Sequence, residues 1–132
     1  MQKILIVDDS STARMFIRRC LEISGCQGAD FYEAANGREA LDMLRETPVD
    51  FILADLNMPE LDGRNMLKRL KSTPRTCDIP VVVISSASNP ASDVELVAEG
   101  AYAVLSKPIT PPGVIASIGS LFKKKEETDG TA

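Results

Sequence analysis

Five short apolar runs divide the chain, each of strand length and each bounded by polar residues, glycine or proline. They are Ile4–Val7, Phe31–Ala34, Phe51–Ala54, Val81–Ile84 and Ala101–Leu105. The first, third and fourth runs are apolar throughout, as strands buried on both faces of a sheet usually are. The second run is flanked by Asp30 and contains Glu33, so we place this strand at an edge of the sheet.

Between these runs, apolar residues recur at the three- and four-residue spacing of amphipathic helices. The longer stripes are Ala13, Phe16, Ile17, Cys20 and Leu21, and Val114, Ile115, Ile118, Leu121 and Phe122. The shorter stripes are Ala40, Leu41 and Leu44, then Met66, Leu67 and Leu70, then Val94, Val97 and Ala98. We expect helices to start near Ser11, Asn89 and Thr110, and to stop near Gly25 and Gly100.

Strand and helix therefore alternate five times, which indicates an α/β fold with a parallel sheet covered on both faces. The 132 residues suffice for one domain with a sizeable core, and we assign that domain to residues 1–122. Residues 123–132 contain no apolar residue except the final alanine, so we expect a disordered C-terminal tail there.

The composition narrows the class of function. With 44% hydrophobic residues and no apolar run near the roughly 20 residues of a membrane span, we expect a cytoplasmic protein that does not contact membranes. The chain has no histidine, which excludes Ser-His-Asp and Cys-His catalysis by its own residues. Its net charge of −4 argues against nucleic acid as a partner. The three cysteines show no C-x-x-C pair, and we expect them to be small buried hydrophobes.

Reactive side chains come directly or shortly after four of the five runs. Asp8 and Asp9 follow the first run, Asp55 the third and Ser85 the fourth, and Lys107 comes shortly after the fifth. Ligands of open α/β sheets bind beyond the carboxyl ends of the strands, so we expect these side chains to meet at one rim of the sheet.

Three carboxylates at one rim repel one another unless a cation intervenes. Mg²⁺ prefers oxygen ligands, so Asp8, Asp9 and Asp55 predict a Mg²⁺ site that a phosphate would complete. Asp55 stands alone before an open turn, which makes it the better nucleophile for an aspartyl phosphate. Lys107 would neutralise one phosphoryl oxygen, and Ser85 would donate a hydrogen bond to another.

Taken one at a time, these residues have plainer interpretations. Asp8 and Asp9 would cap a helix, Asp55 would be a solvated loop acid, Lys107 a surface lysine, and Ser85 a hydroxyl bonded to the backbone. The combination favours a site, because independent accidents would not all fall at the same rim.

Four motifs, in the same order along the chain, resemble those of the response regulator receiver family. They are ILIVDDS (4–10), DLNMPELDG (55–63), VVVISSA (81–87) and SKP (106–108). The resemblance implies a flavodoxin-like three-layer sandwich, in which a five-stranded parallel sheet of order 2-1-3-4-5 is combined with five helices. It also implies a signalling protein rather than an enzyme, one that promotes only its own phosphorylation and dephosphorylation.

The family pattern assigns roles residue by residue. Asp55 matches the phosphoacceptor, Asp9 a direct Mg²⁺ ligand, and Asp8 an acid that acts mostly through water. Asn57 matches the residue whose backbone carbonyl binds the metal, and Ser85 matches the switch hydroxyl.

At the end of the last run, Lys107 matches the family's phosphoryl-binding lysine, and the Lys107–Pro108 bond is expected to be cis. The family's aromatic switch position is Val104 here, and Tyr102 lies two residues earlier on the same predicted strand face. The aromatic part of the switch therefore departs from the family pattern.

The resemblance implies a stand-alone response regulator that takes a phosphoryl group from a histidine kinase or a histidine phosphotransfer protein. Its output would be binding of a downstream protein by the face of the fourth helix, fifth strand and fifth helix. A flavin-binding electron carrier would need a glycine- and hydroxyl-rich phosphate cradle where this chain has two acids. An aspartate-nucleophile phosphatase would need a second aspartate two residues after a first-strand nucleophile. An unphosphorylated scaffold would not need the complete set of reactive residues.

Overall fold

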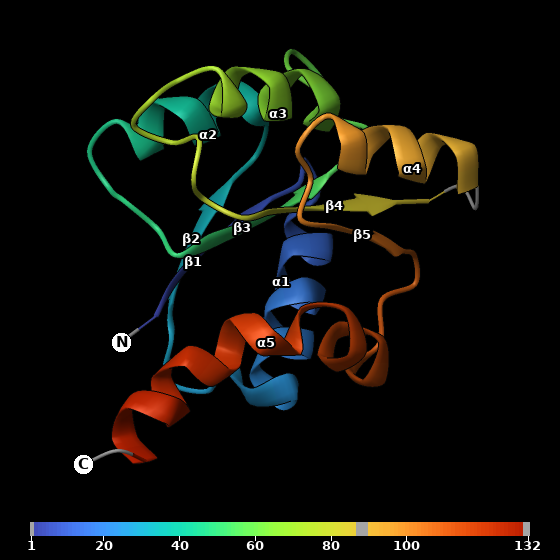
Figure 1. Ribbon diagram of the computed structural model, residues 1–132. Coiled ribbons are helices and arrows are strands. Elements are labelled where there is room, and N and C mark those ends of the chain that lie inside the picture. The colour runs from blue at the N-terminus through green and yellow to red at the C-terminus, as the bar shows by residue number, and fades with distance from the viewer. Residues whose placement is uncertain (1, 87–89, 131–132) are drawn as a thin grey trace.

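One parallel sheet of five strands, in the order β2-β1-β3-β4-β5, forms the middle of the molecule (Figure 1). The structure is a computed structural model that describes residues 2–86 and 90–130, with side chains left out at 90 and 123–130. The strands are β1 (Lys3–Val7), β2 (Asp30–Ala34), β3 (Phe51–Asp55), β4 (Val81–Ser85) and β5 (Ala103–Ser106). The predicted strand order is confirmed, and β2 lies at an edge of the sheet as its polar residues indicated.

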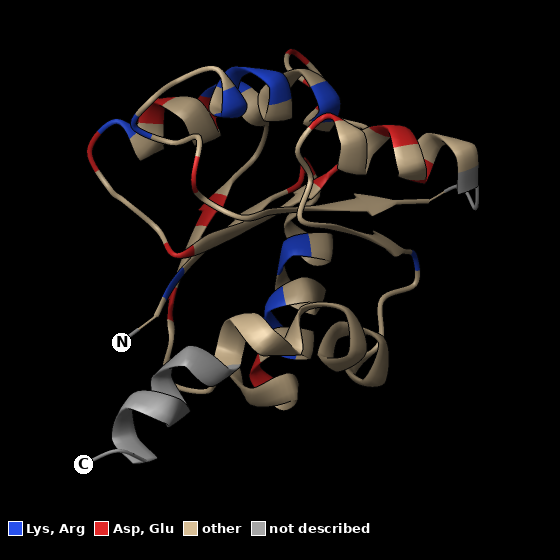
Figure 2. Ribbon diagram, viewed as in Figure 1, with Lys and Arg blue, Asp and Glu red and all other residues tan. Residues whose placement is uncertain are grey.

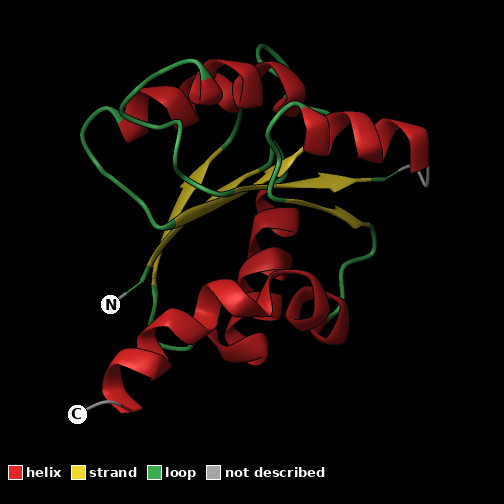
Figure 3. Cartoon of the chain, in the orientation of Figure 1, coloured by secondary structure: helices red, strands yellow, loops and turns green. Residues whose placement is uncertain are grey.

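Helices cover both faces of the sheet, which gives the predicted three-layer sandwich (Figure 3). They are α1 (Ser11–Leu21), α2 (Gly37–Leu44), α3 (Gly63–Lys71), α4 (Pro90–Ala98) and α5 (Pro111–Gly130), with a short π-helical segment, η1 (Glu22–Cys26), after α1. Helices α1 and α5 lie on one face, and α2, α3 and α4 lie on the other (Figure 1). Among the described residues, no helix is both long and apolar enough to cross a bilayer.

Alternation along each strand divides the core into two layers. Along β1, Ile4 and Ile6 pack with α1 and α5, while Leu5 and Val7 pack with α2, α3 and α4. All four side chains are fully buried. Because a central strand must serve both layers, it is apolar at every position, which explains the continuous runs seen in the sequence.

The helix caps follow the sequence closely, with one shift. The N-cap of α1 is Ser10 rather than the predicted Ser11, and its hydroxyl accepts a hydrogen bond from the Ala13 amide at 3.2 Å. Thr110 accepts one from Gly113 at the start of α5, as predicted. Gly25 and Gly100 have φ values of 130° and 118°, the left-handed conformation that ends a helix readily only at glycine. The cap predicted at Asn89 lies outside the described residues.

The apolar stripe predicted for α4 is wrong. Val94 and Val97 are 68% and 50% exposed, and Ala98 is exposed as well, whereas Leu96 is fully buried. Among residues 91–98, whose side chains the structure describes, Leu96 alone is buried, so the contact of this helix with the core is narrow. In α1 the stripe is correct for Ile17, Cys20 and Leu21, but Phe16 is 53% exposed.

Smaller differences concern the end of the chain and the cysteines. The last strand starts at Ala103 rather than Ala101, because the chain still turns after Gly100. Cys20 and Cys26 are buried as expected, and Cys77 is only partly so. The backbone of α5 is helical to Gly130. The side chains of 123–130 and residues 131–132 lie outside the described part, so the tail stays a prediction.

Candidate functional site

Three aspartates from two adjacent strands meet at the carboxyl end of the sheet. Asp8 and Asp9 directly follow β1, and Asp55 is the last residue of β3, its neighbour in the sheet. One carboxylate oxygen from each lies within 4.8 Å of the others. Asp8 and Asp55 are buried, and Asp9 is exposed. The predicted meeting of these acids at one rim is therefore present in the fold.

The Asp8 carboxyl group is buried and incompletely hydrogen-bonded within the described part of the chain. Burial raises the pKa of the Asp8 carboxyl, and the negative charge of Asp55 adds to the rise, while a hydrogen bond from the Ser10 amide opposes it. Its Oδ2 is buried and has no hydrogen-bond partner among the described residues. A buried carboxylate oxygen without a donor, beside two further carboxylates, fits a hard divalent cation such as Mg²⁺.

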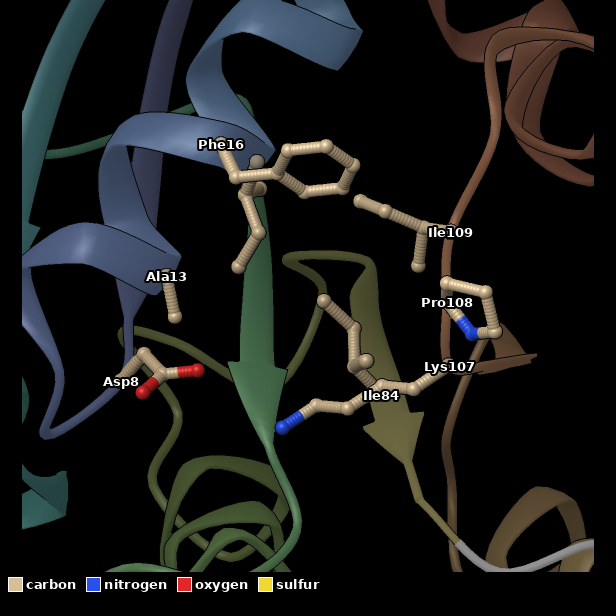
Figure 4. Close-up of a pocket in the computed structure, with 8 residues that line it drawn as sticks. Asp8, Ala13, Phe16, Ile84, Lys107, Pro108 and Ile109 are labelled. Carbon is tan, nitrogen blue, oxygen red and sulfur yellow. The ribbon is translucent and has the colours of Figure 1, made fainter.

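Lys107 directly follows β5, the strand at the other edge of the sheet from β2, and brings positive charge to the same place. Its Nζ lies 3.4 Å from Oδ1 of Asp55, and its backbone amide donates to the Ser85 carbonyl at 2.8 Å. The Lys107–Pro108 peptide is cis, as the resemblance implied. Figure 4 shows the ammonium group extended across the site toward Asp8.

Ser85 and Asn57 flank this cluster. Ser85 is the last residue of β4, is buried, and lies one position beyond Ile84, the register partner of Asp55. Asn57 lies in the exposed turn after β3. The roles predicted for both residues stay predictions.

Tyr102 and Val104 occupy different environments. Tyr102 precedes β5 and is exposed, and its hydroxyl shares a hydrogen bond of 2.8 Å with the Ser120 hydroxyl. Val104 lies on β5 opposite Val83 and packs against the α2–α4 side of the core. The suggested switch role of either residue stays a prediction.

A mostly apolar cavity of about 360 Å³ opens beside the acids, between α1 and the loop before α5 (Figure 4). Phe16, Ile84, Pro108 and Ile109 supply its apolar wall, and Asp8 and Lys107 supply its polar end. The cavity thus lies next to the acids on the α1 side of the sheet.

Two contacts at the site were not predicted from the sequence. Arg14 donates through Nη1 to the backbone carbonyl of Asp8, a contact that joins a helix to the acidic turn. Gly63, at the start of α3, lies so close to β3 that a Cβ there would be 2.5 Å from the Asp55 carbonyl. An Asp-Gly pair such as Asp62-Gly63 is typical of a tight turn, but the sequence carries no comparable signal for the partner of Arg14.

Comparisons with known proteins agree with this arrangement. Residues 4–119 match the family described as "Response regulator receiver domain". Chemotaxis protein CheY1 of Helicobacter pylori is 36% identical over 112 residues, which are 83% of this chain and 87% of that protein. The receiver domain of Francisella response regulator 1452 superposes with a TM-score of 0.81 at 29% identity, covering 95% of this chain and 99% of that one.

A further relative is much longer than the matched region. Protein-glutamate methylesterase/protein-glutamine glutaminase 3 of Rhodospirillum rubrum is 40% identical over 110 residues, which are 82% of this chain but 28% of that protein.

A doubly wound sheet of order 2-1-3-4-5 with this acidic rim is the arrangement of a receiver domain, the class of signalling domain to which the similar solved structure belongs. The chain belongs to the response regulator receiver domain family, and within it to the CheY-like receivers of two-component signalling. Receiver domains generally bind Mg²⁺ at an acidic pocket and interact with histidine kinases or phosphotransfer proteins and with downstream targets.

Proposed function

We propose that this chain accepts a phosphoryl group on Asp55 from a phosphohistidine of a histidine kinase or histidine phosphotransfer protein. The observation that carries the proposal is the convergence of Asp55 with two further acids and with the Lys107 ammonium group, 3.4 Å away. These 132 residues contain no histidine, so they do not themselves supply the phosphohistidine.

The step itself is a displacement at phosphorus. An Asp55 carboxylate oxygen attacks, a P–O bond forms, and the P–N bond to the partner's imidazole breaks. The electron pair of that bond stays on the imidazole nitrogen, which takes up a proton. In this scheme Lys107 holds one phosphoryl oxygen by charge, and the hydroxyl of Ser85 donates to another.

Asp8, Asp9, Asp55 and the backbone carbonyl of Asn57 would hold Mg²⁺, which would neutralise charge on the phosphoryl oxygens when bound. Asp9 suits direct contact because it is exposed, and Asp8 suits a contact through water because its buried Oδ2 lacks a donor among the described residues.

The proposed output is a change of the surface formed by α4, β5 and α5. Movement of Ser85 toward the phosphoryl group would shift the chain after β4 and the helix that follows it. A downstream protein would then bind that surface, and the chain itself would promote only its own phosphorylation and dephosphorylation. We assign this function to a receiver domain of residues 1–122, acting in the cytoplasm without nucleic acid or membrane.

The test is incubation with a small acyl phosphate and Mg²⁺, followed by intact mass measurement. The wild-type chain should gain one phosphoryl group, and Asp55→Asn or chelation of the metal should abolish that gain. Asp42→Asn is the matched control, because Asp42 is an exposed acid on α2, remote from the cluster. Equal gain by wild type and Asp55→Asn would overturn the proposal.

A further inference from the structure

One arginine of α1 links the acidic turn to the edge strand of the sheet. The Arg14 side chain is only 16% exposed. Its Nη1 donates to the Asp8 backbone carbonyl at 2.5 Å, and its Nε pairs with Oε1 of Glu33 on β2 at 2.7 Å. Figure 2 shows basic residues along α1, close to where it leaves β1. A rigid guanidinium fork with two anchored ends fixes both of its partners in direction as well as in distance.

The carbonyl that Arg14 holds belongs to the peptide bond between Asp8 and Asp9. Because a peptide unit is planar, fixing the oxygen of Asp8 fixes the plane from which Asp9 departs. The rest of Asp8 is held as well: its amide donates to the Ala34 carbonyl at 3.1 Å, and its Oδ1 accepts from the Ser10 amide at 2.9 Å. The direction of Asp9 is thus set through its neighbour.

Asp9 itself has little else to direct it. Its side chain is exposed, and across residues 2–86 and 90–130 it makes no hydrogen bond or ion pair to a protein group. Its carboxylate nevertheless lies within 4.8 Å of those of Asp8 and Asp55. The Lys107 ammonium offsets part of the repulsion at Asp55, but the direction of Asp9 depends on the backbone of the turn.

We propose that Arg14, anchored by Glu33, is a positioning residue that holds the Asp8–Asp9 peptide so that the two carboxylates converge on one cation. The inference rests on the proposed function, because it takes the acids to be a Mg²⁺ site. Arg14 touches neither the cation nor the phosphoryl group, and acts through the peptide it orients.

If Arg14 is replaced, a positioning role and a purely electrostatic role predict opposite changes in Mg²⁺ affinity. A cation beside an acidic cluster repels Mg²⁺, so removal of the Arg14 charge would tighten Mg²⁺ binding if charge were its only effect. Loss of a positioning group weakens binding, since groups that orient metal ligands are worth about 10–100-fold in affinity. A plain structural pairing of α1 with β2 would alter stability and leave Mg²⁺ affinity unchanged.

The experiment is titration of the purified full chain with Mg²⁺ by calorimetry, without any phosphodonor. Arg14→Gln should weaken Mg²⁺ binding about tenfold, the low end of that range. Arg14→Lys, which keeps the charge but loses the fork, should weaken it to a similar degree. Arg19→Gln is the matched control, because Arg19 lies on the same helix with a side chain 76% exposed. The Mg²⁺ affinity of this variant should stay within about twofold of that of wild type.

Two further measurements separate the outcomes. Glu33→Ala leaves Arg14 in place but frees its Nε end, and should weaken Mg²⁺ binding about threefold, a fraction of the orienting effect. Unchanged or tighter binding in the Arg14 and Glu33 variants would overturn the inference while leaving the proposed function intact. Absence of Mg²⁺ binding by the wild-type chain would overturn both. Amide exchange at Asp9 and Ser10 in the metal-free Arg14→Gln chain should also be faster than in wild type.

Discussion

At the scale of single residues, burial disfavours the charged form of the Asp8 carboxyl group. Desolvation raises its pKa above the ordinary value of 3.8, and the Asp55 charge raises it further. The folded state therefore retains the Asp8 proton to higher pH than the unfolded state does. As pH rises through the interval from 3.8 to the folded-state pKa, the contribution of Asp8 to stability falls.

Replacing this acid should stabilise the metal-free protein. Asp8→Asn keeps the shape and the hydrogen bond from the Ser10 amide but removes the charge. We expect the free energy of unfolding at about pH 7 to rise by about 1 kcal/mol, and the gain to disappear at about pH 3. Denaturant unfolding with a chelator present, repeated across this pH range, measures both. A variant no more stable than wild type at neutral pH would contradict this account of Asp8.

Gly63 illustrates a residue whose role is steric. A methyl group there would meet the backbone oxygen of Asp55, which cannot move without disturbing β3. Gly63→Ala should lower the free energy of unfolding by about 1–3 kcal/mol, as over-packing usually does.

The matched control is Gly119→Ala, within α5, where an added Cβ would meet only an ordinary contact at 3.5 Å from Ile115. This second variant should gain about 0.5–1 kcal/mol, because alanine favours helix. Denaturant unfolding of both variants measures these two changes in the free energy of unfolding. Equal changes of the same sign would contradict the steric role of Gly63.

Single reactive residues could be predicted from the sequence because they follow buried runs, whose carboxyl ends must share one rim. Asp8, Asp9, Asp55 and Lys107 were found in this way. Arg14 could not be, since its partner Glu33 lies on another element, and helical or strand periodicity carries no information on such a pairing.

At the scale of elements, α4 buries fewer of its described residues than α2 or α3, the other helices on its face of the sheet. It buries Leu96, while Val94 and Val97 point outward. Two ion pairs supplement this contact, from Arg64 of α3 to Glu95 at 3.5 Å and to Glu99 at 3.6 Å. Figure 2 shows the basic stretch of α3 beside the acidic stretch of α4. A helix held in this way suits the proposed change of the surface formed by α4, β5 and α5, because few contacts would have to be broken.

Arg64 should therefore control how firmly α4 is held. Its loss leaves Glu99, whose Oε1 is buried without a partner among the described residues, with its charge uncompensated. We expect Arg64→Gln to speed amide hydrogen exchange across α4 roughly fivefold, equivalent to about 1 kcal/mol, with little change in α1 or α2.

Arg69→Gln provides the control on the same helix, because no ion pair of Arg69 occurs within the described part of the chain. Exchange in α4 should be the same in this variant as in wild type. Equal exchange in Arg64→Gln and wild type would refute the role given to the ion pairs.

The stripe predicted for α4 failed for a related reason. Val94, Val97 and Ala98 satisfy helical spacing, but spacing alone does not say which side of a helix meets the sheet. In α3 the stripe of Met66, Leu67 and Leu70 is buried throughout. That helix packs broadly on the core, whereas α4 touches it along one line.

At the scale of the whole molecule, the proposed binding of Mg²⁺ at the acidic rim would make stability depend on the cation. A ligand that binds only the folded state, at a concentration a hundred times its dissociation constant, adds about 2.7 kcal/mol to the free energy of unfolding. We expect Mg²⁺ at such a concentration to stabilise the wild-type chain by this amount in denaturant unfolding. Asp9→Asn should lose most of the effect while matching wild type without Mg²⁺, since Asp9 is exposed. An equal response of both chains to Mg²⁺ would contradict the assignment of Asp9.

The fold as a whole was largely predictable, because alternating runs and stripes permit few parallel arrangements. The alternation itself indicates a covered parallel sheet, and the polar β2 identifies an edge. The full order β2-β1-β3-β4-β5 came from the receiver resemblance, since nothing in the apolar runs distinguishes β4 from β5 as the neighbour of β3.

The most direct measurement is identification of the residue that carries the phosphoryl group. The chain is treated with a small acyl phosphate and Mg²⁺ and then reduced with borohydride, which converts an acyl phosphate on aspartate to homoserine. Peptide mass sequencing then locates the change. We expect homoserine at position 55 and nowhere else. Homoserine at position 8 or 9, with Asp55 unchanged, would contradict it.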